Sequence, residues 1–90
     1  MILIHAVKAL DGHKVLLHFS NGEQKVMDLL PLLRGPIFDP IRQNLGYFRT
    51  VHVDDESGTI CWDNGADIDP DVLYGSHVPV WQEVENVVQV

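Results

Sequence analysis

Residues 2–28 read ILIHAVKALDGHKVLLHFSNGEQKVMD, and the two glycine dipeptides in this stretch decide the fold. Asp11-Gly12 and Asn21-Gly22 are residue pairs that accept positive φ at both central positions of a type I′ hairpin turn. They separate three β-prone runs, at residues 2–10, 13–20 and 23–28. The stretch therefore predicts a three-stranded antiparallel meander.

Turns of two residues would also fix the strand register. They place Ile4 opposite Phe19 and His5 opposite His18. By alternation along each strand, the predicted core face carries Ile4, Ala6, Val15, Leu17, Phe19 and Val26. The opposite face carries a polar row with apolar neighbours, namely His5, His18, Lys25, Leu3, Val7, Leu16 and Met27. Because this second face is too apolar to be purely solvated, we expect something to cover part of it.

Short helices follow the meander. Asp39-Pro40 and Asp69-Pro70 each predict a helix start, because Asp caps a helix and proline suits its first turn. A helical turn is also expected after Asp28. The tail at 79–88 suits a helix by its spacing and a strand by its β-branching. The sequence thus predicts an α+β fold in one domain over residues 1–90, with a mostly antiparallel sheet packed against two or three short helices.

A second hairpin is predicted from residues 47–53 and 58–63, with Val53 facing Gly58. In this register His52 lies diagonally across from Cys61, at about 7–8 Å. That separation is too long for direct proton transfer, and no third group is evident that would orient the imidazole. The chain also has no Gly-rich phosphate loop and no Ser-centred elbow. The sequence therefore predicts a protein that is not an enzyme.

Composition places the chain among small globular proteins. Its 90 residues are 46% hydrophobic, which suits one compact domain. No apolar run approaches the roughly 20 residues of a membrane span, and the N-terminus lacks the features of a secretory signal. The single cysteine fits a reducing compartment. We therefore expect a cytoplasmic protein that does not bind membranes.

Charge is distributed unevenly along the chain. All six Lys and Arg residues precede residue 54, whereas nine of the 13 Asp and Glu residues lie at 54–90. A net charge of −7 repels phosphate backbones, so nucleic-acid binding by this domain alone is not expected. Two interpretations of the acidic half remain: a solvated face that keeps the protein soluble, or a docking surface for a basic partner.

The acids at 67–71 suggest a calcium loop, but the pattern is incomplete. An EF-hand loop beginning at Asp67 needs Gly at the position of Val72 and Glu at the position of Val78. Asp69 and Asp71 have a simpler use at the start of the expected helix, as its cap and in its first turn. A divalent-cation site stays an alternative.

The His5–His18 pair suggests zinc in the same way. Two imidazoles lack the further ligands that a zinc site needs, and Lys25 beside them opposes a cation. A pH-sensitive, partner-facing row or an ordinary sheet surface are the other interpretations. We expect no bound metal or cofactor.

The segment at 62–74, WDNGADIDPDVLY, resembles the signature of a bacterial family known as domain of unknown function 2442. Further matching pieces lie at 19–23 (FSNGE), 28–32 (DLLPL), 48–54 (FRTVHVD) and 58–62 (GTICW). The resemblance implies the α+β fold but no established activity or catalytic residue. Some longer relatives carry a helix-turn-helix domain after the signature, for which 16 residues after Tyr74 are too few. Others accompany small toxin-like proteins.

The predicted function is a non-catalytic protein-interaction module, with an antitoxin-like acidic partner of a small basic protein as its specific form. Self-association is the other kind of partnership we expect. The alternative is a small-ligand or divalent-metal regulatory domain around residues 67–71. The candidate partner-binding residues are His5, Leu16, His18, Lys25, Met27, Trp62, Asn64, Asp67, Asp69, Asp71 and Tyr74.

Overall fold

A computed structural model of the chain describes residues 2–75. Strands β1 (Ile4–Ala9), β2 (Lys14–Phe19) and β3 (Gln24–Asp28) form one antiparallel sheet in that order, and β4 (His52–Asp54) pairs with β5 (Thr59–Cys61) in a second. The helical elements are η1 (Leu30–Leu32), η2 (Pro36–Phe38), α1 (Asp39–Gln43), α2 (Leu45–Phe48) and α3 (Pro70–Tyr74). The predicted α+β fold is confirmed, whereas the expected element at 79–88 lies outside the described residues.

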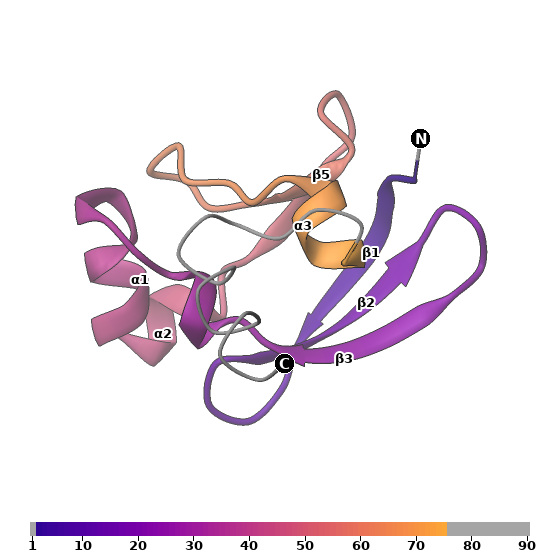
Figure 1. Cartoon of the computed structure of the whole chain (residues 1–90). Helices are drawn as coiled ribbons and strands as arrows, with labels where there is room; N and C mark the ends of the chain where they lie inside the picture. Colours follow the sequence, from indigo (N-terminus) through magenta and orange to yellow (C-terminus); the bar gives the residue numbers. More distant parts are fainter. Residues whose placement is uncertain (1, 76–90) are drawn as a thin grey trace, which may run out of the picture.

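The elements are held together by one cluster of buried side chains. Figure 1 shows α1 and α2 grouped at one end, with α3 (orange) between the β4–β5 hairpin and the three-stranded sheet. The buried apolar residues are Ile4, Val15, Leu17, Phe19, Leu29, Leu32, Leu33, Ile41, Phe48, Ile60, Trp62, Ala66, Ile68 and Leu73. Strands of both sheets and several of the helices contribute side chains to this cluster. In residues 2–75 no helix has the length and apolar character needed to cross a membrane.

The second hairpin loop of the meander has three residues rather than two. Phe19 pairs with Glu23, since the Phe19 amide donates to the Glu23 carbonyl (2.9 Å), and Gly22 takes φ +90° at the third loop position. Glycine at the third position of a three-residue loop is the other common use of an Asn-Gly pair. Every residue of β3 is thereby turned over: Val26, predicted in the core, faces outward and is 59% exposed.

The loop of the first hairpin is also one residue longer than predicted. Leu10 pairs with Lys14 through an N–H···O bond of 2.8 Å, which leaves a three-residue loop. This loop sets His18 opposite Ala6, and an irregularity between Ile4 and Ala6 then restores the predicted pairing of Ile4 with Phe19. The predicted His5–His18 pair is therefore wrong. The extra loop residue moves all of β1 beyond the irregularity by one position.

The two faces of the sheet change accordingly. Val7 and Met27, predicted on the second face, pack against the core. Lys25 also turns to the core side, where its Nζ donates to the Leu73 carbonyl at 3.0 Å. Pairing and alternation define an outer sheet face made of Ala6, Lys8, Lys14, Leu16, His18, Gln24, Val26 and Asp28. The residues predicted to form a half-apolar second face therefore do not share one face of the sheet.

The β4–β5 hairpin keeps its predicted faces but shifts in register by two residues. Val53 lies opposite Ile60 instead of Gly58. Gly58 ends the loop, because its amide donates to the Asp54 carbonyl at 2.7 Å and its φ is +71°. The Gly58 carbonyl in turn accepts from the Ile4 amide at 2.7 Å. This bond connects the hairpin to the edge of β1.

Candidate functional site

The register of the β4–β5 hairpin sets His52 directly opposite Cys61. The Cys61 Sγ lies 3.4 Å from His52 Nε2, so the predicted diagonal separation is wrong. The other imidazole nitrogen, Nδ1, lies 3.1 Å from the Thr50 carbonyl. A proton on Nδ1 would be donated to that carbonyl and would leave Nε2 as an acceptor for the thiol. No local sequence pattern signals this contact, because it depends on the loop closing at Gly58.

Carboxylates surround the pair. Burial raises the pKa of the Cys61 thiol, and the negative charges of Asp54, Asp67 and Asp63 raise this pKa further. Asp63 Oδ1 lies 3.8 Å from His52 Nε2, and its side chain is 83% exposed. The backbone of Asp67 bridges to Cys61. We call the surface made by His52, Asp54, Cys61, Asp63 and Asp67 the acidic hairpin face.

The electrostatics of this face oppose thiolate chemistry. Reactive cysteines are found beside positive charge, which lowers the thiol pKa, whereas three carboxylates act on Cys61. Within residues 2–75, no group of three or more His, Cys, Asp and Glu side chains has the geometry to hold a metal ion. The arrangement therefore presents negative charge to solvent and disfavours a nucleophile.

We expect Cys61 to react slowly with iodoacetamide near neutral pH. Only the thiolate reacts, and a raised pKa moves the rate profile to higher pH. Asp67→Asn removes one of the charges that raise this pKa, so its profile should move to lower pH. Asp55→Asn in the neighbouring turn is the control, since Asp55 is not among the charges that raise it. Mass spectrometry of the alkylated protein across pH measures both, and identical profiles for the two variants would contradict the assignment.

The segment at 62–74 is largely scaffold. Trp62 is 2% exposed, and its indole N–H donates to the Phe48 carbonyl at 3.0 Å. Asn64 holds the turn after it: its side-chain amide donates to the Ile37 carbonyl (2.9 Å), and its Oδ1 accepts from the Ala66 amide (3.0 Å). These two candidate partner-binding residues are therefore engaged within the protein.

Helix α3 uses three further candidates. Asp69 is its N-cap, with a side-chain oxygen that accepts from the amide of Asp71 at 2.8 Å. The Tyr74 ring packs edge-on against Phe19 with centroids 5.1 Å apart. Its hydroxyl hydrogen-bonds Glu23, which lowers the pKa of that carboxyl and raises the pKa of Tyr74. These contacts attach α3 to the β2–β3 turn.

The remaining candidates lie apart from one another. His5 is exposed at the irregularity in β1, and Leu16 and His18 are half-buried on the outer sheet face. Lys25 and Met27 face the core side. Of all the predicted partner-binding residues, Asp67 alone lies on the acidic hairpin face. The structure thus divides the predicted site among several surfaces.

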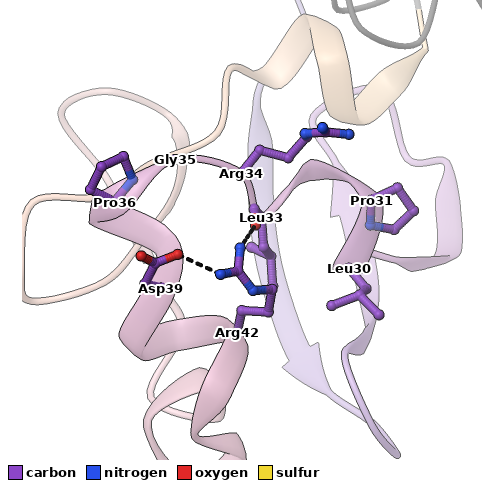
Figure 2. Close-up of a pocket in the computed structure, with 8 residues that line it drawn as sticks. All are labelled: Leu30, Pro31, Leu33, Arg34, Gly35, Pro36, Asp39 and Arg42. Carbon is purple, nitrogen blue, oxygen red and sulfur yellow. Dashed lines mark hydrogen bonds and ion pairs between the residues drawn. The ribbon is translucent and has the colours of Figure 1, made fainter.

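A surface pocket of about 600 Å³ lies between η1 and α1. Figure 2 shows Arg42 directed at Asp39 and at the Leu33 carbonyl, while Arg34 extends away from this pair. The Arg42 guanidinium donates to both partners, 2.9 Å from the Leu33 carbonyl. Its donors therefore hold η1 against α1. The i, i+3 spacing of Asp39 and Arg42 is the sequence signal from which this ion pair could have been predicted.

Comparison with known proteins gives one result. A family model described as "Protein of unknown function (DUF2442)" matches residues 4–78. No curated protein and no solved structure matches the chain. The matched range contains every strand and helix described above, as well as the acidic hairpin face. Because the match covers most of the 90 residues, the chain belongs to the DUF2442 family of proteins of unknown function.

Proposed function

We propose that this protein is a non-catalytic interaction module that binds a basic segment of a partner protein through the acidic hairpin face. The observation that carries the proposal is the convergence of Asp54, Asp63 and Asp67 around Cys61 of the β4–β5 strand pair. Their combined field reaches the Cys61 thiol, whose pKa it raises.

Charge complementarity favours a basic partner. No Lys or Arg occurs in residues 54–90, so that half of the chain supplies no cation of these types to neutralise its acids. Grouped exposed charges of one sign accelerate encounter with the opposite sign and select against like-charged partners. An antitoxin-like neutraliser of a small basic protein is the specific form that this proposal takes. On this proposal the protein acts in the cytoplasm and away from nucleic acids, which the single cysteine and the net negative charge support.

The test uses the full chain, tagged and recovered from its native host at low salt. Asp63→Asn with Asp67→Asn removes two charges from the acidic hairpin face. The matched control, Asp11→Asn with Asp28→Asn, changes the net charge by the same amount in the β1–β3 meander, outside the acidic hairpin face. Asn at position 28 keeps the side-chain oxygen with which Asp28 accepts from the Leu30 amide.

We expect a stoichiometric basic partner that the control retains and the Asp63/Asp67 variant loses, with affinity reduced at least about tenfold and falling with salt. Affinity is measured by titration calorimetry once mass spectrometry has identified the partner. Equal retention by both double variants, or no stoichiometric partner at any salt concentration, would count against the proposal.

The alternative of a metal or small-ligand regulator around residues 67–71 gains less support. Asp69 is already engaged as the cap of α3. Calorimetry with calcium, magnesium and manganese separates the two functions, since a binding heat abolished by Asp67→Asn would favour the alternative.

A further inference from the structure

Within residues 2–75, one edge of strand β3 is paired with β2 and the other edge is open. Phe19 with Glu23 and His13 with Leu29 are hydrogen-bonded pairs of the β2–β3 ladder. By alternation, the N–H and C=O groups of Gln24, Val26 and Asp28 point away from β2. Among residues 2–75 no backbone or side-chain group hydrogen-bonds these outward groups. In this part of the chain the edge therefore presents three N–H and C=O pairs, one at every second residue.

Several of the usual protections of an edge strand are missing from β3. Proteins blunt such edges with proline, with bulges, with outward lysines, with inward-pointing charges, or by covering the edge with a helix or loop. Residues Gln24–Asp28 contain no proline, and the ladder with β2 is regular throughout. The one lysine, Lys25, is an inward-pointing charge, but its Nζ is already bound to the Leu73 carbonyl of the same chain. Val26 stands at the middle of the edge with 59% of its surface exposed.

We propose that β3 pairs with β3 of a second copy of this chain, antiparallel about a twofold axis at Val26. In that register Val26 of each copy exchanges two backbone hydrogen bonds with the other, and Gln24 does so with Asp28 of the second copy. Lys25 then lies opposite Met27 of the second copy. The edge is thus self-complementary: no like charges face each other, and the two exposed valines bury one another.

The position of the acids agrees with this pairing. Figure 1 shows β3 along the border of the molecule opposite the β4–β5 hairpin. The two β4–β5 hairpins would therefore lie on the far sides of the dimer from the new strand pair, and salt screens charges separated by more than about 8 Å. A dimer formed in this way leaves both faces open. The pairing uses a surface separate from the proposed partner site, so each proposal can fail without the other.

Analytical ultracentrifugation of the full chain over a range of concentrations is the test. We expect a wild-type dimer. Val26→Lys and Val26→Glu should each raise the dimer dissociation constant at least about tenfold, because like charges then meet across the axis and the apolar pair is lost. An equimolar mixture of the two variants should associate again. Leu45→Lys, at an exposed apolar position in α2, is the matched control and should dimerise as wild type does.

Several results would overturn the proposal. The first is a wild-type chain that stays monomeric at the highest soluble concentration. The second is a Val26→Lys variant that dimerises as wild type does. The third is a pair of folded Val26→Lys and Val26→Glu variants that fail to associate when mixed. Amide hydrogen exchange shows whether something other than a second copy pairs with the β3 edge. A Val26 amide protected in a monomer would assign the edge to residues 76–90, and protection only in a complex with another protein would assign it to that partner. Amides of Gln24, Val26 and Asp28 protected in wild type but not in Val26→Lys support the dimer.

Discussion

Trp62→Ala is expected to remove about 3–5 kcal/mol from the free energy of unfolding. Trp62 is 2% exposed, and its ring packs against two phenylalanine rings, with centroids 6.1 Å from both Phe38 and Phe48. A domain of this size has about 5–13 kcal/mol in total. The variant should therefore be partly unfolded at 25 °C or unfold at a much lower urea concentration. Urea unfolding followed by far-UV circular dichroism measures the loss without depending on the missing indole.

Two controls separate the contributions of Trp62. Trp62→Phe keeps much of the packing but removes the indole N–H bond to the Phe48 carbonyl, which still accepts from the Val51 amide at 3.1 Å. We therefore expect this variant to lose about 0.5–1.5 kcal/mol. Leu45→Ala changes an apolar residue that is 46% exposed and should alter stability by about 0.5 kcal/mol or less. A Trp62→Ala variant that loses no more than Leu45→Ala would contradict the assignment of Trp62 to the core.

The sequence predicts the elements of this fold better than their alignment. Asn21-Gly22 correctly marks a hairpin, but the same dipeptide serves two-residue and three-residue loops. One extra loop residue turns over a whole strand, because side chains alternate with a period of two. Val26 and Lys25 therefore lie on the faces opposite to those predicted, although the strand that carries them is where the sequence predicts it. The local sequence contains no signal that chooses between the two loop lengths.

The β4–β5 hairpin shows the opposite outcome. Its predicted register is wrong by two residues, and a shift of two preserves the faces. Val53 and Ile60 thus share one face as predicted, whereas the direct His52–Cys61 contact differs from the prediction. Contacts between individual side chains depend on register to the residue, whereas burial depends only on whether the shift is even or odd.

The candidate site shows a different limit of sequence-based prediction. Trp62 and Tyr74 stand out in the sequence, and aromatic residues of this kind serve cores and binding surfaces equally. Their tertiary partners, Phe48 and Phe19, decide between the two roles. The charge asymmetry, by contrast, needs no tertiary information, because nine acids without a Lys or Arg remain acidic in any fold.

Gly58→Ala should cost about 2–5 kcal/mol through two effects. The residue takes φ +71°, where an alanine is strained by about 1–2 kcal/mol. A Cβ at this position would also lie 2.9–3.1 Å from three side-chain atoms of Leu3. Overpacking of this kind adds about 1–3 kcal/mol. Leu3 cannot retreat freely, because its amide donates to Ser20 Oγ and its carbonyl accepts from the Ser20 amide.

Gly22→Ala isolates the strain. Gly22 has φ +90°, but a Cβ added there would have no atom within 4 Å, so its variant should lose only the conformational part. Equal losses at the two glycines would show that Leu3 moves aside. A double variant with Leu3→Ala tests the steric part directly, since its loss should be smaller than the sum of the single losses.

Hydrogen exchange then locates the damage from Gly58→Ala. The Ile4 amide donates to the Gly58 carbonyl, and this bond holds the β4–β5 hairpin against β1. We expect the Ile4 amide to lose protection in Gly58→Ala beyond the loss seen at buried positions of β2 such as Leu17. Because the variant disturbs the junction rather than the core, local opening should exceed global unfolding. Uniform loss of protection in both strands would instead mean that the hairpin and the meander unfold as one unit.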